Sequence, residues 1–368
     1  MRIFAINPGS TSTKIALFDD DACVFSKNVS HDAEELATYQ DVSDQLPYRK
    51  QTILDLLAEK GVDLEGVEAV VGRGGGLLPM EGGTYLVDDR LLEDARCGAN
   101  GVSHPAQLGS QLAHEFARRY GACAFVVNPP DVDELQELAR LTGIAGVYRT
   151  VHLHALNLKE TAIRHAAVLG RSYDACNFVV CHIGGGVSVS AHRRGRMIDG
   201  FDIVGGEGPL APTRCGSVAL AGMVDWCEVH GLAAAKALCT KTGGFVDLTG
   251  TSDAIELTRR AEAGDKRAAL VWNTMIYQIE KCIGSMAAVL AGEVDGILLG
   301  GGMVHSDDLV SQIVDACSWI APVTAYPGEF EMEAMAAGAV RVMTGVEQAK
   351  RYTGQPAWTP PAWLCSQA

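Results

Sequence analysis

The sequence predicts an α/β fold with two domains of related topology. Three observations support this prediction. The chain has 368 residues, enough for two domains of ordinary size. Apolar runs of strand length alternate with segments of helical periodicity. One order of elements, a strand, a glycine-rich turn and a second strand, occurs at Ile6–Phe18 and again at Asn177–Asp199, and we interpret this as an internal duplication.

In the first half, the opening turn lies between apolar runs at Arg2–Ile6 and Lys14–Asp19, which predicts a hairpin. A helix is expected over Pro47–Lys60, because proline favours a helix start and Gly61 a helix end. The following segments predict, in order, a buried strand in Val67–Gly72, a helix from Pro105 to Gly121, and a strand, a turn and a helix within Ala122–Gly143.

The second half begins with a helix expected at about 153–169. The long apolar segment Ala269–Gly292 contains Asn273 and Glu280, so it indicates a buried helix and not a membrane span. A strand, three glycines and a helix follow within Val294–Val314. The tail 353–368 is rich in proline and tryptophan without a period, so we expect it to be poorly ordered or to lie across a neighbouring surface.

Composition excludes several classes of protein. The net charge is −15, with 45 acidic against 30 basic residues, which disfavours a nucleic-acid partner. The 11 cysteines include no C-x-x-C pair, so neither a disulfide framework nor a zinc site is indicated. No basic leader with an apolar core opens the chain. We therefore expect a cytoplasmic protein without a membrane partner, whose thiols are reduced.

The opening turn is a candidate phosphate site. Backbone N–H groups of a Gly/Ser/Thr turn form a concavity that binds anions, and Ser10, Thr11 and Ser12 add hydroxyl donors. Lys14 supplies a positive charge at the edge of the turn. Asn7 offers an amide to a substrate oxygen or to a metal-bound water. The alternative is an ordinary hairpin whose hydroxyl groups satisfy its own turn.

Two further glycine turns make this set more specific. His182 precedes Gly184–Gly186, and Gly300–Gly302 follows a later apolar strand. Glycines let the backbone approach a ligand without interference from Cβ atoms, although they also serve tight turns. Together the three turns suit a triphosphate held between two lobes, with the last turn under the nucleoside.

The motifs INPGSTSTKIALFD, VVGRGGGLLP, LHALN, HIGGGVSV, GEGPLAPTRCGS, ILLGGG and GEFEMEAMA occur in the order seen in butyrate kinases and their acetate kinase relatives. The chain resembles this family from residue 1 to about residue 345. The resemblance implies membership of the superfamily of sugar kinases, actin and heat-shock chaperone ATPases. The NPG opening and the short GEGP segment look more like the butyrate and branched-chain acid branch than the acetate branch.

The resemblance implies two ribonuclease-H-like domains of duplicated topology with an interdomain nucleotide cleft. The first domain would span 1–150 plus a C-terminal helix at about 332–352, and the second, which binds the nucleotide, would span 151–331. The implied reaction is the reversible, in-line transfer of a phosphoryl group from ATP to a short-chain carboxylate, with Mg²⁺, giving an acyl phosphate and ADP. A homodimer or a larger homo-oligomer is also implied.

The resemblance assigns roles residue by residue. It places Arg73, His154 and Arg214 in catalysis; Asn7, Ser10, Ser12, Lys14, His182, Gly184, Gly185 and Gly186 at the phosphates; Asp253, Gly300, Gly301 and Gly302 at the adenosine; and Glu331, or its neighbour Glu329, at the metal together with Asn7.

Physical chemistry agrees with these roles. Phosphoryl transfer needs positioning and charge neutralisation more than covalent chemistry, and two planar guanidinium groups can hold a carboxylate beside a phosphoryl group. The alternatives are ordinary ones: a surface salt bridge for Arg73 and Arg214, a capping or core histidine for His154, and a solvated helix-end charge for Glu331.

Asn128 is a departure from the family, which usually has an aspartate before this proline. An amide keeps the oxygen and loses the charge, so metal binding could weaken, although Asp131 and Asp133 follow closely. An alcohol acceptor needs a base, whereas a carboxylic acid with a pKa near roughly 4.3 is already ionised. Asn128 therefore favours an acid kinase over two alternatives, a sugar or alcohol kinase and a catalytically weakened ATP-binding homologue.

Overall fold

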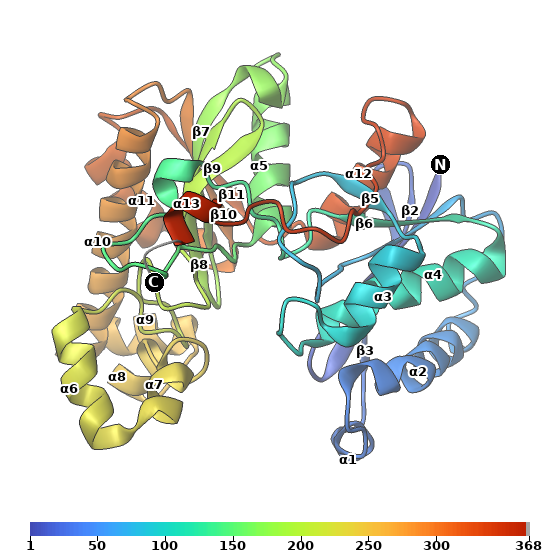
Figure 1. Cartoon of the computed structure of the whole chain (residues 1–368), viewed down its shortest axis with the longest axis horizontal. Helices are drawn as coiled ribbons and strands as arrows, with labels where there is room; N and C mark the ends of the chain where they lie inside the picture. Colours follow the sequence, from blue (N-terminus) through green and yellow to red (C-terminus); the bar gives the residue numbers. More distant parts are fainter. Residues whose placement is uncertain (366–368) are drawn as a thin grey trace. The chain divides into compact units, whose positions relative to one another are not determined.

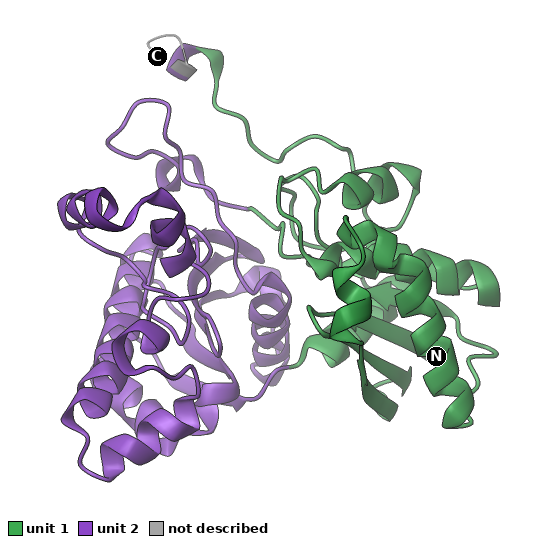
Figure 2. Cartoon of the chain, turned by 90° about the horizontal axis from the view of Figure 1, so that it is seen from below, with its two compact units in different colours: residues 1–133, 330–362 green, residues 134–329, 363–368 purple. Residues whose placement is uncertain are grey.

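The computed structural model describes residues 1–365, and the chain divides into two compact units (Figure 2). Unit 1 comprises Met1–Asp133 and Phe330–Ala362, and unit 2 comprises Glu134–Glu329 and the residues from Trp363 onward. The first division therefore falls before residue 150, the boundary expected from the sequence. The reason is local, because Gln136 N donates to Ile198 O at 2.9 Å and ties this segment to unit 2.

Unit 1 is built on a six-stranded sheet of order β3-β2-β1-β4-β6-β5 (Figure 1). The first three strands form an antiparallel meander, β4 and β6 run parallel to β1, and β5 is an antiparallel edge strand. The strands are β1 (Arg2–Pro8), β2 (Ser12–Asp19), β3 (Ala22–Ser30), β4 (Ala69–Gly72), β5 (Thr84–Leu86) and β6 (Cys123–Val127).

The helices of unit 1 pack on this sheet through apolar faces. Phe116 of α4 meets Phe4 of β1 edge to face, with ring centroids 5.4 Å apart. The expected helix at Pro47–Lys60 forms, and the one expected from Pro105 begins as a short 3₁₀ turn before α4. The helices are α1 (Ala33–Ala37), α2 (Leu46–Glu59), α3 (Asp89–Cys97), α4 (Leu108–Tyr120) and α12 (Glu331–Met343).

Unit 2 repeats the topology of unit 1. Its five-stranded sheet has the order β11-β10-β7-β8-β9, in which β9-β8-β7 is again an antiparallel meander and β10 and β11 are parallel to β7. The order β3-β2-β1-β4-β6 of unit 1 is the same. The duplication expected from the sequence is therefore confirmed. The strands are β7 (Asn177–Ile183), β8 (Val187–Arg193), β9 (Arg196–Gly200), β10 (Gly296–Gly301) and β11 (Val323–Pro327).

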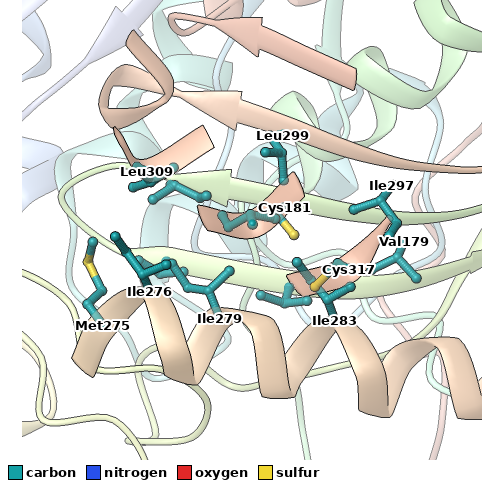
Figure 3. Packing of buried hydrophobic residues seen from close by; sticks show 14 of the residues in the cluster. Val179, Cys181, Met275, Ile276, Ile279, Ile283, Ile297, Leu299, Leu309 and Cys317 are labelled. Carbon is teal, nitrogen blue, oxygen red and sulfur yellow. The ribbon is translucent and has the colours of Figure 1, made fainter. Parts of the chain in front are cut away.

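The core of unit 2 lies between this sheet and the long helix α10. Ile276, Ile279 and Ile283 of α10 point toward the sheet and share a cluster with buried Cys181 of β7 and Cys317, the last residue of α11 (Figure 3). Burial raises the pKa of the Cys317 thiol to about 11, as expected of a core residue. The helices are α5 (Ala155–Val168), α6 (Leu220–His230), α7 (Leu232–Leu238), α8 (Phe245–Thr249), α9 (Ala254–Glu262), α10 (Lys266–Val289), α11 (Asp307–Cys317) and α13 (Ala362–Cys365).

The expectation of a buried helix holds for one face of α10, whereas Asn273, Tyr277 and Lys281 on its other side are exposed. Within residues 1–365, none of the helices combines the length and the apolar character needed to cross a bilayer.

The helix expected after Asn128 does not form, and only a 3₁₀ turn at Glu137–Ala139 is present. Tertiary hydrogen bonds keep the preceding segment extended. Met80 N donates to Asp131 O at 3.0 Å, and Asp133 N donates to Met80 O at 2.8 Å. These bonds outweigh the local helical pattern, which carries only a weak preference.

The segment just before the C-terminal tail lies against the edge of the unit 1 sheet. Lys350 N donates to Thr84 O at 2.8 Å, Leu86 N donates to Lys350 O at 3.0 Å, and Tyr352 is buried. The expectation of a poorly ordered tail covered 353–368, of which residues 366–368 lie outside the described residues.

Candidate active site

The opening turn of unit 1 directs its carbonyl groups inward. It joins β1 to β2 and is closed by a hydrogen bond of 2.7 Å from Gly9 N to Ser12 O. The side chain of Arg49, on α2, donates to the carbonyl oxygens of Gly9 at 2.8 Å and Ser10 at 3.1 Å. Ser10 and Thr11 are exposed at the tip, and Lys14 is exposed on β2. The turn therefore presents hydroxyl groups and a lysine to the outside.

Three candidate residues of unit 1 gather at the carboxyl ends of parallel strands. Ile6 of β1 pairs with Gly72 of β4, which in turn pairs with Val126 of β6. Asn7, Arg73 and Asn128, which lie just past these positions, are therefore placed at one edge of the sheet. Ligands of open α/β sheets bind at such an edge.

Glu331, at the start of α12, joins two of these residues. The Asn7 amide donates to a Glu331 carboxylate oxygen at 2.6 Å, and Arg73 Nε lies 3.7 Å from the other oxygen. Arg73 is 8% exposed, and its Nη1 atom has no hydrogen-bond partner within residues 1–365. A buried guanidinium group that is only partly satisfied is suited to an anionic ligand.

Asn128 has a structural role of its own. Its backbone has φ of 39°, a left-handed conformation that asparagine adopts more readily than most residues. Its side-chain oxygen accepts a hydrogen bond of 2.7 Å from Gly83 N. Asp131, a possible substitute for the family aspartate, accepts one of 2.6 Å from the Asn100 amide. An aspartate at 128 could make the same bond to Gly83.

In unit 2, the turn Gly184–Gly186 lies beneath the guanidinium group of Arg214. A Cβ atom added to Gly186 would lie 1.7 Å from Arg214 Nη1, so only glycine allows this approach. Nε and Nη1 of Arg214 are buried and have no hydrogen-bond partner in the part of the chain that the structure describes. Burial lowers the pKa of Arg214, and the nearby charge of Asp202 opposes that shift.

Two histidines stand beside this turn. The rings of His154 and His182 stack with centroids 4.0 Å apart, and His154 Nδ1 lies 2.8 Å from the Ser188 hydroxyl oxygen. His182 Nε2 lies 3.8 Å from a carboxylate oxygen of Glu329. Of the two glutamates considered for the metal, Glu331 lies against Asn7 and Arg73, and Glu329 lies against His182.

The segment that carries Arg214 is held by Arg149. The guanidinium group of Arg149 donates to both carboxylate oxygens of Glu207, each at 3.1 Å, and to Asp199 at 3.1 Å. Glu207 is the acidic residue of the GEGP motif. Such a bidentate pair fixes geometry as well as charge, so Arg149 orients the loop that leads to Arg214.

The third glycine turn follows β10. Gly300 pairs with His182 across neighbouring parallel strands, which brings Gly300–Gly302 beside the second turn. Asp253 has a different setting, because its carboxylate accepts hydrogen bonds from Ile255 N and Glu256 N and caps α9. That contact explains Asp253 without a nucleotide.

Sequence reasoning missed Arg49 and Arg149. Arg49 had a detectable signal, since it shares the buried stripe of α2 with Ile53 and Leu57 at spacings of four. A charged residue on the apolar face of a helix indicates buried polar partners. No local sequence pattern marks Arg149, because its partners Asp199 and Glu207 are far along the chain.

The donor groups of unit 1 fit a magnesium ion that arrives with a nucleotide. No group of three or more His, Cys, Asp or Glu side chains suited to a metal occurs among the described residues. Magnesium that is bound together with a nucleotide needs fewer protein ligands, because substrate phosphates and water fill most of its coordination sphere. The Glu331 carboxylate and the Asn7 amide are oxygen donors of the required kind.

Solved structures similar to this chain define its class of fold. Acetate kinase from Porphyromonas gingivalis is 19% identical, with a TM-score of 0.77 over 94% of this chain and 100% of its own. Acetate kinase from Entamoeba histolytica is 15% identical, with a TM-score of 0.73 over 92% and 99%. A propionate kinase from Francisella tularensis subsp. tularensis SCHU S4 is 16% identical, with a TM-score of 0.70 over 91% and 98%. The chain has the two-domain fold of the acetate kinases.

Part of the chain also matches the sequence model of a protein family. Residues 146–318, which make up most of unit 2, match the sequence model of the acetokinase family. The matched range contains His154, His182, the turn Gly184–Gly186 and Arg214.

Proposed function

We propose that this protein is a kinase that phosphorylates a short-chain carboxylic acid, most readily butyrate or a branched-chain analogue. The fold and the acetokinase match of residues 146–318 support a carboxylate as the acceptor. The motifs NPG and GEGP support the longer acids. A homodimer or a larger homo-oligomer is part of the proposal, and light scattering would test it.

One observation carries the proposal: Arg73 and the half-buried Arg214 each have buried guanidinium nitrogen atoms without a hydrogen-bond partner among the described residues. Two planar forks suit a carboxylate and a phosphoryl group, which are both anionic and both accept paired hydrogen bonds. A neutral sugar hydroxyl group would bring no negative charge to these unpartnered donors.

In the proposed reaction, an oxygen of the ionised acid attacks the γ-phosphorus of ATP. The new P–O bond forms as the bond to the β-phosphate oxygen breaks, and ADP departs with the electron pair. No proton moves, so no base is required at Asn128. We expect His154, whose Nδ1 lies 2.8 Å from the Ser188 hydroxyl oxygen, to donate to an equatorial phosphoryl oxygen.

The remaining residues bind and orient the nucleotide. The turn at Gly9–Ser12 with Lys14, and the turn at Gly184–Gly186 with His182, would hold the phosphates, while Gly300–Gly302 would lie at the nucleoside. Glu331 and Asn7 would hold Mg²⁺, which neutralises phosphate charge when it is bound.

The test is an acyl hydroxamate assay with Mg-ATP, hydroxylamine and a series of straight and branched acids from two to six carbons. We expect product, with the highest kcat/KM at four carbons or a branched equivalent. No product from any acid would refute the proposal, and phosphorylation of a polyol alone would favour an alcohol kinase.

Asn128 supports one second candidate, an ATP-binding homologue with weakened chemistry. The amide at this position removes a charge that the family's metal site usually has. Calorimetric binding of Mg-ATP without turnover of any acid would identify this candidate.

A further inference from the structure

We propose that Arg49 is a positioning residue of the phosphate-binding turn, and that it supplies a buried positive charge behind that turn. The inference deepens the proposed function and depends on the opening turn being a phosphate site.

The first line of evidence is where the carbonyl groups of the turn point. Arg49 Nη1 lies 2.8 Å from Gly9 O and 3.4 Å from Ser12 O, and Nη2 lies 3.1 Å from Ser10 O. The fourth carbonyl, of Thr11, accepts a hydrogen bond of 3.0 Å from His31 N. All four carbonyl oxygens of the turn are therefore occupied on its inner side.

The backbone N–H groups at the tip of the turn, unlike its carbonyl groups, make no hydrogen bond within the described residues. Ser10 and Thr11 are exposed, and within residues 1–365 their backbone N–H groups donate to no protein acceptor. A turn whose carbonyls bond inward and whose amides remain available is a concavity for anions. The contacts of Arg49 thus select the conformation that a phosphate requires.

The second line of evidence is the charge of Arg49. Its side chain is 0% exposed, and it forms no ion pair within the described residues. Its side-chain partners among the described residues are the amide of Gln45, 3.0 Å from Nε, and the hydroxyl of Thr13, 3.3 Å from Nη1. Tyr48 and His31 lie nearby.

The neighbouring titratable groups do not compensate this charge. Burial and the charge of Arg49 lower the pKa of His31 to about 4, so His31 is neutral at pH 7. His104, which also senses Arg49 and Arg73, has a pKa lowered mainly by burial. A buried cation without a counter-ion is costly, and a bound polyphosphate on the far side of the turn would relieve that cost.

The experiment measures binding of inorganic tripolyphosphate and of ADP to the full chain by calorimetry. The variants are R49Q, which removes the charge, R49K, which keeps it without the planar fork, and K50Q as a matched control. Lys50 is the next residue on α2 and pairs with Glu115 at 2.7 Å. Circular dichroism would establish that each variant is folded.

We expect wild-type protein to bind tripolyphosphate, K50Q to bind equally, and R49Q to bind about tenfold more weakly or worse. R49K should be intermediate at pH 7 and should approach R49Q as the pH rises toward 9, because a buried ammonium group loses its proton more easily. Wild-type affinity should change little over this range, since burial lowers the pKa of Arg49 only to about 10.

Equal binding by R49Q and wild type would overturn the inference, and so would pH profiles of R49K and R49Q that coincide. If R49Q does not fold, R49K and its pH profile decide the question. The proposed function fails separately: wild-type protein that binds tripolyphosphate but forms no hydroxamate refutes the reaction and leaves the role of Arg49 intact.

Discussion

The two hairpin turns of the duplicated units use arginine in opposite ways. In unit 1, Arg49 lies behind the turn, and its donors are taken up by protein carbonyl groups. In unit 2, Arg214 lies over Gly186, and two of its nitrogens have no partner among the described residues. One guanidinium group supports the conformation of a turn, and the other remains available for a ligand.

This difference teaches that the same residue type beside equivalent turns need not share a role. A side chain whose donors are satisfied within the protein should affect stability when it is removed. One with unsatisfied donors should affect activity and leave stability unchanged or improved. The following predictions test that contrast.

The largest effect is expected from R214Q. Loss of the guanidinium group should lower kcat/KM for acid phosphorylation by about 10²–10³-fold, because charge stabilisation in the transition state is lost. The free energy of unfolding should stay within about 0.5 kcal/mol of wild type or rise, since a half-buried and poorly paired charge is removed. The hydroxamate assay and urea denaturation measure the two quantities. If R214Q destabilised the protein as much as we expect of R49Q, the proposed contrast between the two arginines would be contradicted.

R49Q should destabilise the protein by about 2 kcal/mol or more, because the carbonyl groups of Gly9 and Ser10 lose their donor. Urea denaturation of the variant without nucleotide provides the measurement. K50Q should change stability by less than about 0.5 kcal/mol, as expected for a surface ion pair. Equal stability of R49Q and K50Q would show that the turn holds its shape without Arg49.

G186A should lower kcat/KM by about 10–100-fold, because the new methyl group would displace Arg214. The control is G185A at the adjacent position, where an added Cβ meets nothing within 4 Å. G185A should lose less activity than G186A, because its added methyl group does not displace Arg214. Similar losses in both variants would mean that flexibility of the turn matters more than the approach of Arg214.

The pH dependence of stability should report the environment of Arg49. The pKa of His31 is lowered to about 4 in the folded protein, so the unfolded chain binds the proton more readily below about pH 6.5. Stability should be complete above pH 6.5 and should fall as the pH drops toward 4. Between pH 7 and 5, H31Q should lose roughly 1–2 kcal/mol less than wild type in urea denaturation. Parallel curves for the two proteins would contradict this assignment.

The smallest effect is expected from N128D. The aspartate can accept the hydrogen bond from Gly83 N that the asparagine accepts now, so the fold should be retained. The added charge beside the nucleotide site should raise kcat a few-fold at saturating Mg²⁺. Steady-state kinetics over a magnesium titration would show this. A lower rate would mean that the amide is itself adapted to this site.

Local patterns predicted the fold well where the sequence controls structure locally. The hairpins, the helix from Pro47 and the duplicated order of strands all followed from apolar periodicity and glycine or proline punctuation. The helix expected after Asn128 was wrong because Met80, about fifty positions earlier in the chain, bonds that segment in an extended form. Periodicity carries no information about such distant partners.

The roles of the candidate site residues stay predictions, and the sequence identified some of these residues without the contacts around them. The motifs located Arg73, Arg214 and both turns, but not the groups that hold them. Arg149 reaches Glu207 through a contact between distant residues, which a single sequence does not reveal. The role proposed for Asp253 stays a prediction, and the capping contacts of its carboxylate give it a structural explanation.

The backbone pairing between Lys350 and β5 bears on aggregation through the edge of the sheet. An uncovered outermost strand offers free amide and carbonyl groups on which a strand of another molecule can add. In this protein the backbone of Lys350 covers part of the edge strand β5, through hydrogen bonds with Thr84 and Leu86. The segment after α12 thus occupies backbone groups of β5 that another strand could otherwise use, although it contributes no group to the proposed chemistry.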